Sequence, residues 1–132
     1  MKTGILGSVG SLQRLIAAVF FGLGGWCVIA PASVIDLTIR PEHASHAPIV
    51  LVSIGAFGAQ ACLAGLFAAL TRFTRATFLG FGAALLPFFV FDWWFYAVQP
   101  LFNRLIVLDV AGNLIMLALC WRGYRLAEVS GS

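Results

Sequence analysis

Residues 47–70 read APIVLVSIGAFGAQACLAGLFAAL and contain no charged side chain. An α-helix of about 20 such residues crosses the roughly 30 Å hydrocarbon core of a bilayer. Three further apolar stretches of similar length surround this one, at about 12–35, 76–98 and 101–121. Because strict alternation of apolar and polar residues is absent, the four stretches predict membrane-spanning helices and not the strands of a membrane barrel.

The composition of the whole chain agrees with a membrane protein. The chain has 132 residues, enough for a single domain, of which 61% are hydrophobic and 10% are charged, and its mean hydropathy is +1.00. A soluble domain carries about 25% charged residues, so this chain cannot cover a water-facing surface. Its eight Lys and Arg residues give a net charge of +3 but form no basic run, which excludes a nucleic-acid-binding protein.

Short polar segments at 36–46, 71–75 and 99–100 separate the four stretches. This spacing predicts an all-α, integral membrane four-helix bundle with up-down-up-down topology. If the spans alternate, Arg40 and Arg104 fall on one side, and six basic residues fall on the other: Lys2, Arg14, Arg72, Arg75, Arg122 and Arg125. The positive-inside rule then makes both termini cytoplasmic. Lys2 and Ala30-Pro31-Ala32 also fit a secretory signal with a cleavage site, but we expect the first span to be retained.

Helices in lipid pack closely only where their side chains are small. Ala61, Gly65 and Ala69 lie on one stripe of the second span, and further glycines occur in the first and third spans. These residues serve packing within the chain, which is the interpretation we favour, or the contacts of a homo-oligomer.

Polar residues inside the spans are the candidates for a functional site, because each one costs free energy in the membrane. The site candidates are Trp26, Gln60, Asp92, Arg104, Asp109 and Asn113. At a rise of about 1.5 Å per residue, Asp92 and Asp109 lie at nearly the same depth on either side of the turn at Pro100. Asn113 lies one turn deeper on the face of Asp109. Gln60 and Trp26 reach a similar level, so one polar layer across the bundle is expected.

Two carboxylates at one depth in an apolar medium do not both ionise at low cost, so they share a proton or a cation neutralises them. Arg104 stands about one turn nearer the surface than Asp109 and can supply this positive charge. We therefore favour a structural network of aspartate, arginine and asparagine that sets the helix register. The functional alternative is a proton- or cation-binding site, or a polar pocket for a lipid headgroup or a quinone.

The remaining reactive residues form no recognisable site. His43 and His46 lack the further ligands of a metal centre, so no metal is predicted. Cys27, Cys62 and Cys120 form no CxxC motif and are expected to be buried apolar fillers. Nucleophile, phosphate-loop and other catalytic motifs are absent, so no catalytic residue is assigned, and the sequence identifies no cofactor.

Two short motifs lie within the last two spans. They are Leu86-Pro87-Phe88-Phe89 followed by Asp92, and Gly112-Asn113-Leu114-Ile115-Met116-Leu117. Together with the spacing of the spans, they resemble the small four-helix bacterial membrane proteins called DoxX-like. The resemblance implies a multi-pass protein of the bacterial inner membrane. It carries over no catalytic residue, although some members of that group accompany quinol oxidation.

Three functions follow from these observations. The first is a non-catalytic subunit or accessory factor of a membrane assembly, with the lipid bilayer and other membrane subunits as its partners. The second is a small proton- or cation-linked transporter that uses Asp92 and Asp109. The third is a membrane enzyme acting on a quinone, sterol or lipid, for which the same two carboxyl groups are the available acid and base. No acidic residue precedes Asp36, which counts against the small multidrug transporters with their glutamate in the first span.

Overall fold

The computed structural model describes residue 4 and residues 6–129. These residues form five α-helices: α1 (Val9–Ile29), α2 (Pro31–Thr38), α3 (Pro48–Leu70), α4 (Arg75–Trp93) and α5 (Ile106–Val129). A π-helical turn, η1 (Trp94–Val98), extends α4. Helices α1, α3 and α5, and α4 together with η1, are each long and apolar enough to cross a membrane. The prediction of an all-α protein with four membrane-length helices is confirmed.

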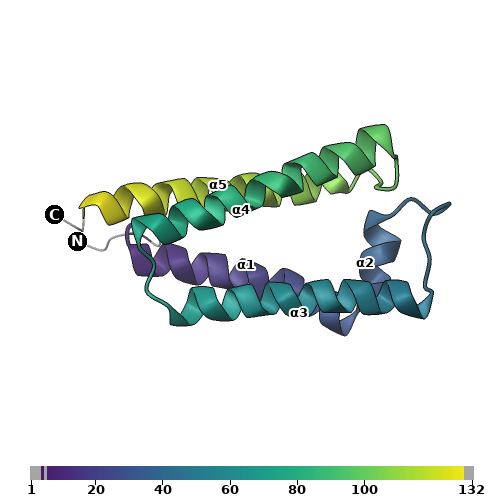
Figure 1. Cartoon of the computed structure of the whole chain (residues 1–132), viewed down its shortest axis with the longest axis horizontal. Coiled ribbons are helices and arrows are strands. Elements are labelled where there is room, and N and C mark those ends of the chain that lie inside the picture. The colour runs from purple at the N-terminus through teal and green to yellow at the C-terminus, as the bar shows by residue number, and fades with distance from the viewer. Residues whose placement is uncertain (1–3, 5, 130–132) are drawn as a thin grey trace.

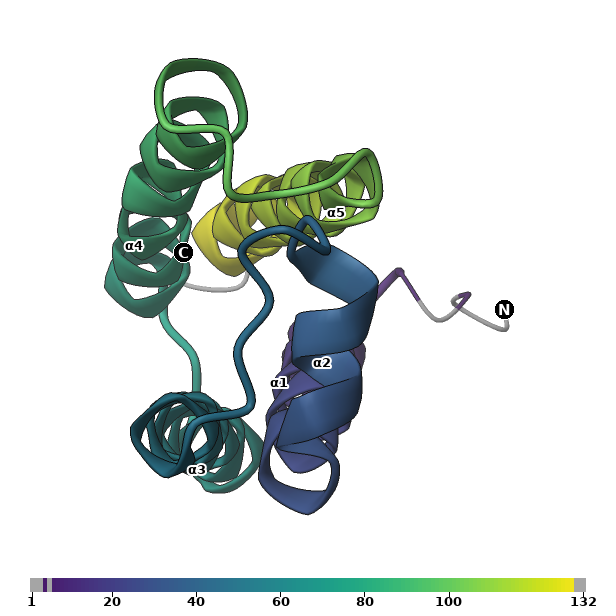
Figure 2. The ribbon, with the colours of Figure 1, turned by 90° about the vertical axis from the view of Figure 1, so that its right-hand side faces the viewer.

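The four long helices lie side by side as two pairs. Figure 2 shows α1 beside α3 and α4 beside α5, and α1 also packs against α5. In Figure 1, α1 begins and α5 ends at one end of the molecule, where α3 also connects to α4. We call this the arginine-rich end, after its arginines: Arg14, Arg72, Arg75, Arg122 and Arg125. The opposite end, which carries α2 and the α4–α5 connection, is the α2 end.

The first apolar stretch is not one continuous helix. Helix α1 ends at Ile29, and α2 begins at Pro31. Proline has no N–H to continue the helical ladder and disfavours helical geometry in the residue before it. Accordingly, Ala30 leaves the helical region, with φ −137° and ψ 59°. The indole N–H of Trp26 donates to Ser33 Oγ at 2.7 Å across this bend, so α2 turns away from the axis of α1.

The last long helix begins later than the sequence predicts, at Ile106 instead of residue 101, and it continues to Val129. The residues before it are extended and pair with the segment after α2 through a bridge between Ile39 and Phe102. Arg40 N–H donates to Leu101 O at 2.8 Å, and Asn103 N–H donates to Thr38 O at 2.9 Å. These backbone bonds replace the first helical turn, because each backbone group in a buried segment needs a partner.

Helices α1 and α3 cross with their backbones in contact at Gly24 and Gly58. A Cβ atom built on Gly24 would lie 2.6 Å from the carbonyl oxygen of Gly58, and one on Gly58 would lie 2.5 Å from that of Gly24. Gly65 of the predicted small-residue stripe is also buried, and a Cβ atom there would lie 3.2 Å from Ala17 O, although Ala69 is exposed. Gly24, Gly58 and Gly65 therefore serve packing within the chain.

At the arginine-rich end, the buried side chain of Gln13 joins α1 to the α3–α4 connection. Its Nε2 donates to Ala68 O at 2.7 Å and also to Thr71 O, and its Oε1 accepts from Phe73 N–H at 3.3 Å. The sequence contains a signal for this role, because Gln13 is a polar residue inside an apolar stretch.

Candidate functional site

Asp92 is the one carboxylate that is buried in the part of the chain that the structure describes, with 6% of its surface exposed. It lies in the last turn of α4, directly before η1. Its Oδ2 atom is buried and has no hydrogen-bond partner. Because buried polar atoms are nearly always paired in proteins, this oxygen requires an explanation beyond packing.

Two polar side chains of α5 face Asp92. Asp109 lies in the first turn of α5, and Asn113 follows it one turn later. Asn113 Nδ2 donates to Asp109 Oδ2 at 3.0 Å, and both side chains interact with the carboxyl group of Asp92 across the α4–α5 interface. Asp109 is exposed at the surface of the bundle, whereas Asn113 is half-buried. We call these three residues the carboxyl cluster.

The helix dipole stabilises a negative charge on one of the two carboxyl groups and not on the other. Asp109 is at the N-terminus of α5, where the partial positive charge of the helix dipole stabilises a negative charge. Asp92 lies six residues before the end of the continuous helix formed by α4 and η1, and it gains no such stabilisation. A negative charge in the carboxyl cluster is therefore better accommodated on Asp109 than on Asp92.

The other three site candidates lie apart from the carboxyl cluster. Trp26 bonds to Ser33 at the α1–α2 bend, and Gln60 is exposed on α3. Arg104 forms no ion pair with Asp92 or Asp109 among the described residues. It instead contributes to a polar pocket of about 420 Å³ at the α2 end, lined by Arg40, Glu42, Tyr96, Asn103 and Arg104. Of the six site candidates, the three that lie together are therefore those of the carboxyl cluster, on α4 and α5.

The cysteines and histidines are distributed as single groups or pairs. Cys27 and Cys120 are buried, Cys62 is half-buried, and all three are free thiols. His46 Nε2 lies 2.8 Å from Asp36 Oδ1 on the surface of the α2 end. Within residues 4 and 6–129, no group of three or more histidine, cysteine or acidic side chains is arranged to hold a metal ion.

Comparison with known proteins assigns no family to this arrangement. No family model matches the chain, and neither the curated proteins nor the solved structures give a match. The resemblance to DoxX-like proteins is therefore not supported. The four membrane-length helices and the high hydropathy nevertheless define the class of protein. The chain is an integral, multi-pass membrane protein in contact with the lipid bilayer.

Proposed function

We propose that this protein is a small proton- or cation-linked membrane transporter, with the carboxyl cluster as the site that binds and releases the ion. The observation that carries this proposal is the buried Asp92 Oδ2 atom, which has no partner and lies beside a second carboxyl group. A carboxyl group inside a membrane is normally compensated by a positive charge. Arg104, the candidate for that charge, lies in the polar pocket instead.

The chemistry of the cluster suits one exchangeable positive charge. Two interacting carboxyl groups in an apolar medium hold a proton or a small cation between them more readily than two negative charges. Asn113 holds Asp109 through its amide N–H and leaves its own carbonyl oxygen as a further ligand. Asp109 lies in the first turn of α5, close to the end of that span, and the proposed path of exchange to the buried Asp92 passes through it.

The polar pocket at the α2 end supports an aqueous entrance to this site. Its residue Tyr96 lies in η1, one helical turn after Asp92, and its residue Arg104 lies two residues before the start of α5. The segments that flank the carboxyl cluster on both helices therefore also line the pocket.

The distribution of arginines supports the orientation of the chain in its membrane. The described part of the arginine-rich end holds five arginines, whereas Arg40 and Arg104 lie at the α2 end. Lys2, which belongs to the same prediction, lies outside the described residues. By the positive-inside rule, the arginine-rich end and both termini are cytoplasmic, and the carboxyl cluster lies toward the outer surface. The bacterial inner membrane is the proposed location.

A second candidate function is a subunit or accessory factor of a membrane assembly, or a homo-oligomer. Several glycines within the long helices face open space, with nothing within 4 Å of a Cβ atom built on them: Gly22, Gly25, Gly55, Gly80 and Gly112. Packing within the chain does not require glycine at these positions. They leave shallow surfaces against which a helix of a partner or of a second copy can pack closely.

Labelling with a hydrophobic carbodiimide tests the ion-binding proposal, because this reagent reacts with protonated carboxyl groups in apolar surroundings. The purified protein in detergent is labelled over a range of pH, with and without Na⁺ or K⁺, and the modified residue is found by mass spectrometry. We expect modification at Asp92 that falls as the pH rises, or that one of the cations suppresses. Asp92→Asn removes the modification, whereas the matched control Asp36→Asn, at an exposed carboxylate, leaves it unchanged.

The structural alternative gives a different result. If labelling of Asp92 is absent at every pH, or is insensitive to both pH and cations, the cluster does not exchange an ion and the proposal is wrong. Thermal unfolding of Asp92→Asn and Asp92→Glu in detergent completes the comparison. A network that only sets helix register predicts a lower melting temperature for both variants, without any pH- or cation-dependent labelling in the native protein.

A further inference from the structure

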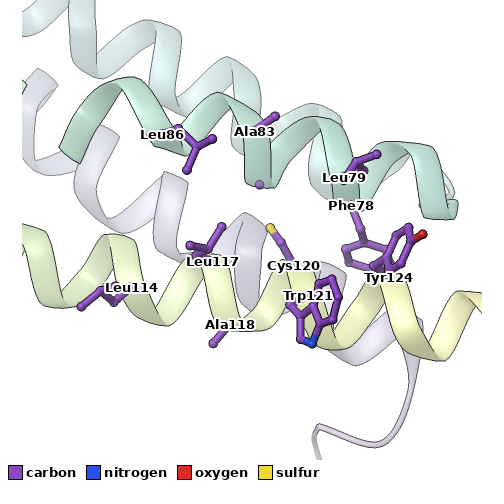
Figure 3. Close-up of a pocket in the computed structure, with 11 residues that line it drawn as sticks. Phe78, Leu79, Ala83, Leu86, Leu114, Leu117, Ala118, Cys120, Trp121 and Tyr124 are labelled. Carbon is purple, nitrogen blue, oxygen red and sulfur yellow. The ribbon is translucent and has the colours of Figure 1, made fainter. Parts of the chain in front are cut away.

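A second feature of the α4–α5 pair is an apolar groove of about 570 Å³ (Figure 3). Its lining residues precede Asp92 on α4 and follow Asn113 on α5, so the groove lies nearer to the arginine-rich end than the carboxyl cluster does. Its lining includes Leu79, Ala83 and Leu86 of α4, and Leu117, Ala118 and Trp121 of α5. The volume is within the range of about 300–1,000 Å³ that is typical of sites for small molecules. Because the lining is apolar and faces a bilayer, the groove suits a hydrocarbon chain.

The length of the groove matches one leaflet of a membrane. Its lining residues on α5 run from Leu114 to Tyr124, which is about 15 Å at the rise of an α-helix. Half of a hydrocarbon core of about 30 Å is the same length. The groove therefore extends from the membrane surface at the arginine-rich end to about the middle of the bilayer, as an acyl chain does.

The surface end of the groove combines aromatic rings with arginines. Tyr124 stacks on Trp121 with ring centroids 5.7 Å apart, and its hydroxyl oxygen accepts from Arg75 Nη2 at 2.5 Å. The guanidinium carbon of Arg75 lies 4.4 Å from the centre of the Tyr124 ring, and that of Arg125 lies 6.0 Å from the centre of the Trp121 ring. Aromatic and basic residues of this kind anchor proteins at the level of the lipid headgroups.

The electrostatic charge at this end favours an anionic headgroup. Five arginines and one acidic residue, Glu128, leave a net charge of +4 on the described part of the arginine-rich end. Glu128 lies 3.5 Å from Arg75 and 4.0 Å from Arg125, so it neutralises only part of that charge. At the α2 end, Arg40 and Arg104 are balanced by Asp36 and Glu42.

We propose that the groove binds one acyl chain of an anionic phospholipid, with the phosphate of that lipid lying against Arg75 and Arg125. Each basic residue near the membrane surface strengthens the attraction for an anionic lipid by about fivefold. The groove supplies the apolar contact that holds the lipid in place, and the arginines select its headgroup. This site shares no residue with the carboxyl cluster, so it does not depend on the function proposed above.

Lipid retention in detergent tests the proposal directly. The full chain is extracted from vesicles of equal phosphatidylglycerol and phosphatidylcholine, and the lipid that remains bound is counted by native mass spectrometry. We expect about fivefold or greater preference for phosphatidylglycerol, and about a fivefold loss of that preference in Arg125→Gln. The matched control is Arg104→Gln, the same change at the α2 end, which leaves the preference unchanged.

A second pair of variants tests whether the groove itself is occupied. Ala83 lines the groove, whereas its exposed neighbour Ala84 does not. Ala83→Leu fills the groove and is expected to lower retention of the bound lipid, whereas Ala84→Leu retains the lipid of the native chain. Equal retention of the two lipids, or no effect of Ala83→Leu, overturns the proposal. A dimer that Ala83→Leu dissociates also overturns it, because the groove then holds a second copy.

Discussion

Replacing Gly58 with alanine tests the crossing of α1 and α3, which holds one helix pair together. A Cβ atom at this position would lie 2.5 Å from Gly24 O, 2.6 Å from Cys27 Cβ and 2.9 Å from Val28 N. Two of these three neighbours are backbone atoms, which cannot rotate away. Ordinary contact begins at 3.4 Å, so the two helices must move apart by about 1 Å at the crossing.

The free energy of this displacement follows from the packing that it removes. Overpacking a close helix contact costs about 1–3 kcal/mol. Alanine also favours the helix over glycine by about 1 kcal/mol, which offsets part of that cost. Gly55, about one turn earlier on the same helix, has open space around a Cβ atom, so Gly55→Ala retains only the favourable contribution. We therefore expect Gly58→Ala to be less stable than Gly55→Ala by about 1–3 kcal/mol.

Equilibrium unfolding in mixed detergent micelles, followed by circular dichroism, measures this difference. Gly24→Ala and Gly25→Ala form the corresponding pair on α1, because a Cβ atom clashes at Gly24 and meets nothing within 4 Å at Gly25. If Gly58→Ala and Gly55→Ala unfold at the same denaturant concentration, α1 and α3 do not form the close backbone contact at Gly58.

Two further predictions concern the arginine-rich end and the orientation of the chain. Gln13→Leu removes the side-chain hydrogen bonds to Ala68 O, Thr71 O and Phe73 N–H. Because these backbone groups are then left unpaired, we expect the free energy of unfolding to fall by about 1–3 kcal/mol. The same detergent titration measures this change. Little or no destabilisation would mean that the α3–α4 connection does not depend on Gln13. A cysteine introduced at the exposed Ser45 reacts with a membrane-impermeant thiol reagent added outside intact cells, and labelling only after the cells are opened contradicts the proposed orientation.

Several features of the fold were predictable because the bilayer restricts the choice. The hydrocarbon core offers no water to the backbone of a segment such as 47–70, so its N–H and C=O groups can all be paired only in a helix or a closed barrel. Helix rise also predicts similar depths for Asp92 and Asp109 on either side of the turn, with Asn113 one turn deeper on the face of Asp109. The structure brings these three side chains together, and their role in ion binding stays a prediction.

Other features depend on contacts between distant segments. The Ala30-Pro31 bend differs from these, because it has a local cause: a proline at this position ends one helix and begins another, which the apolar pattern of residues 12–35 does not show. The start of α5 at Ile106 reflects backbone pairing of residues 101–103 with residues 38–40, which periodicity cannot reveal. Arg104 was expected beside Asp109 from its spacing, but this unwound segment places it in the polar pocket.

Hydropathy and span length are properties of each segment alone, so they are sufficient to predict that this chain is helical and crosses a membrane. The sequence also limits the chemistry of the membrane interior to a few polar side chains. Which of those side chains meet depends on how the helices pack against one another. The packing of the helices also distinguishes two kinds of glycine. Gly24 and Gly58 form a helix crossing, whereas Gly25 and Gly55 face open space. Residues of equal hydropathy differ in role because their neighbours come from other helices, and this information is absent from any single segment.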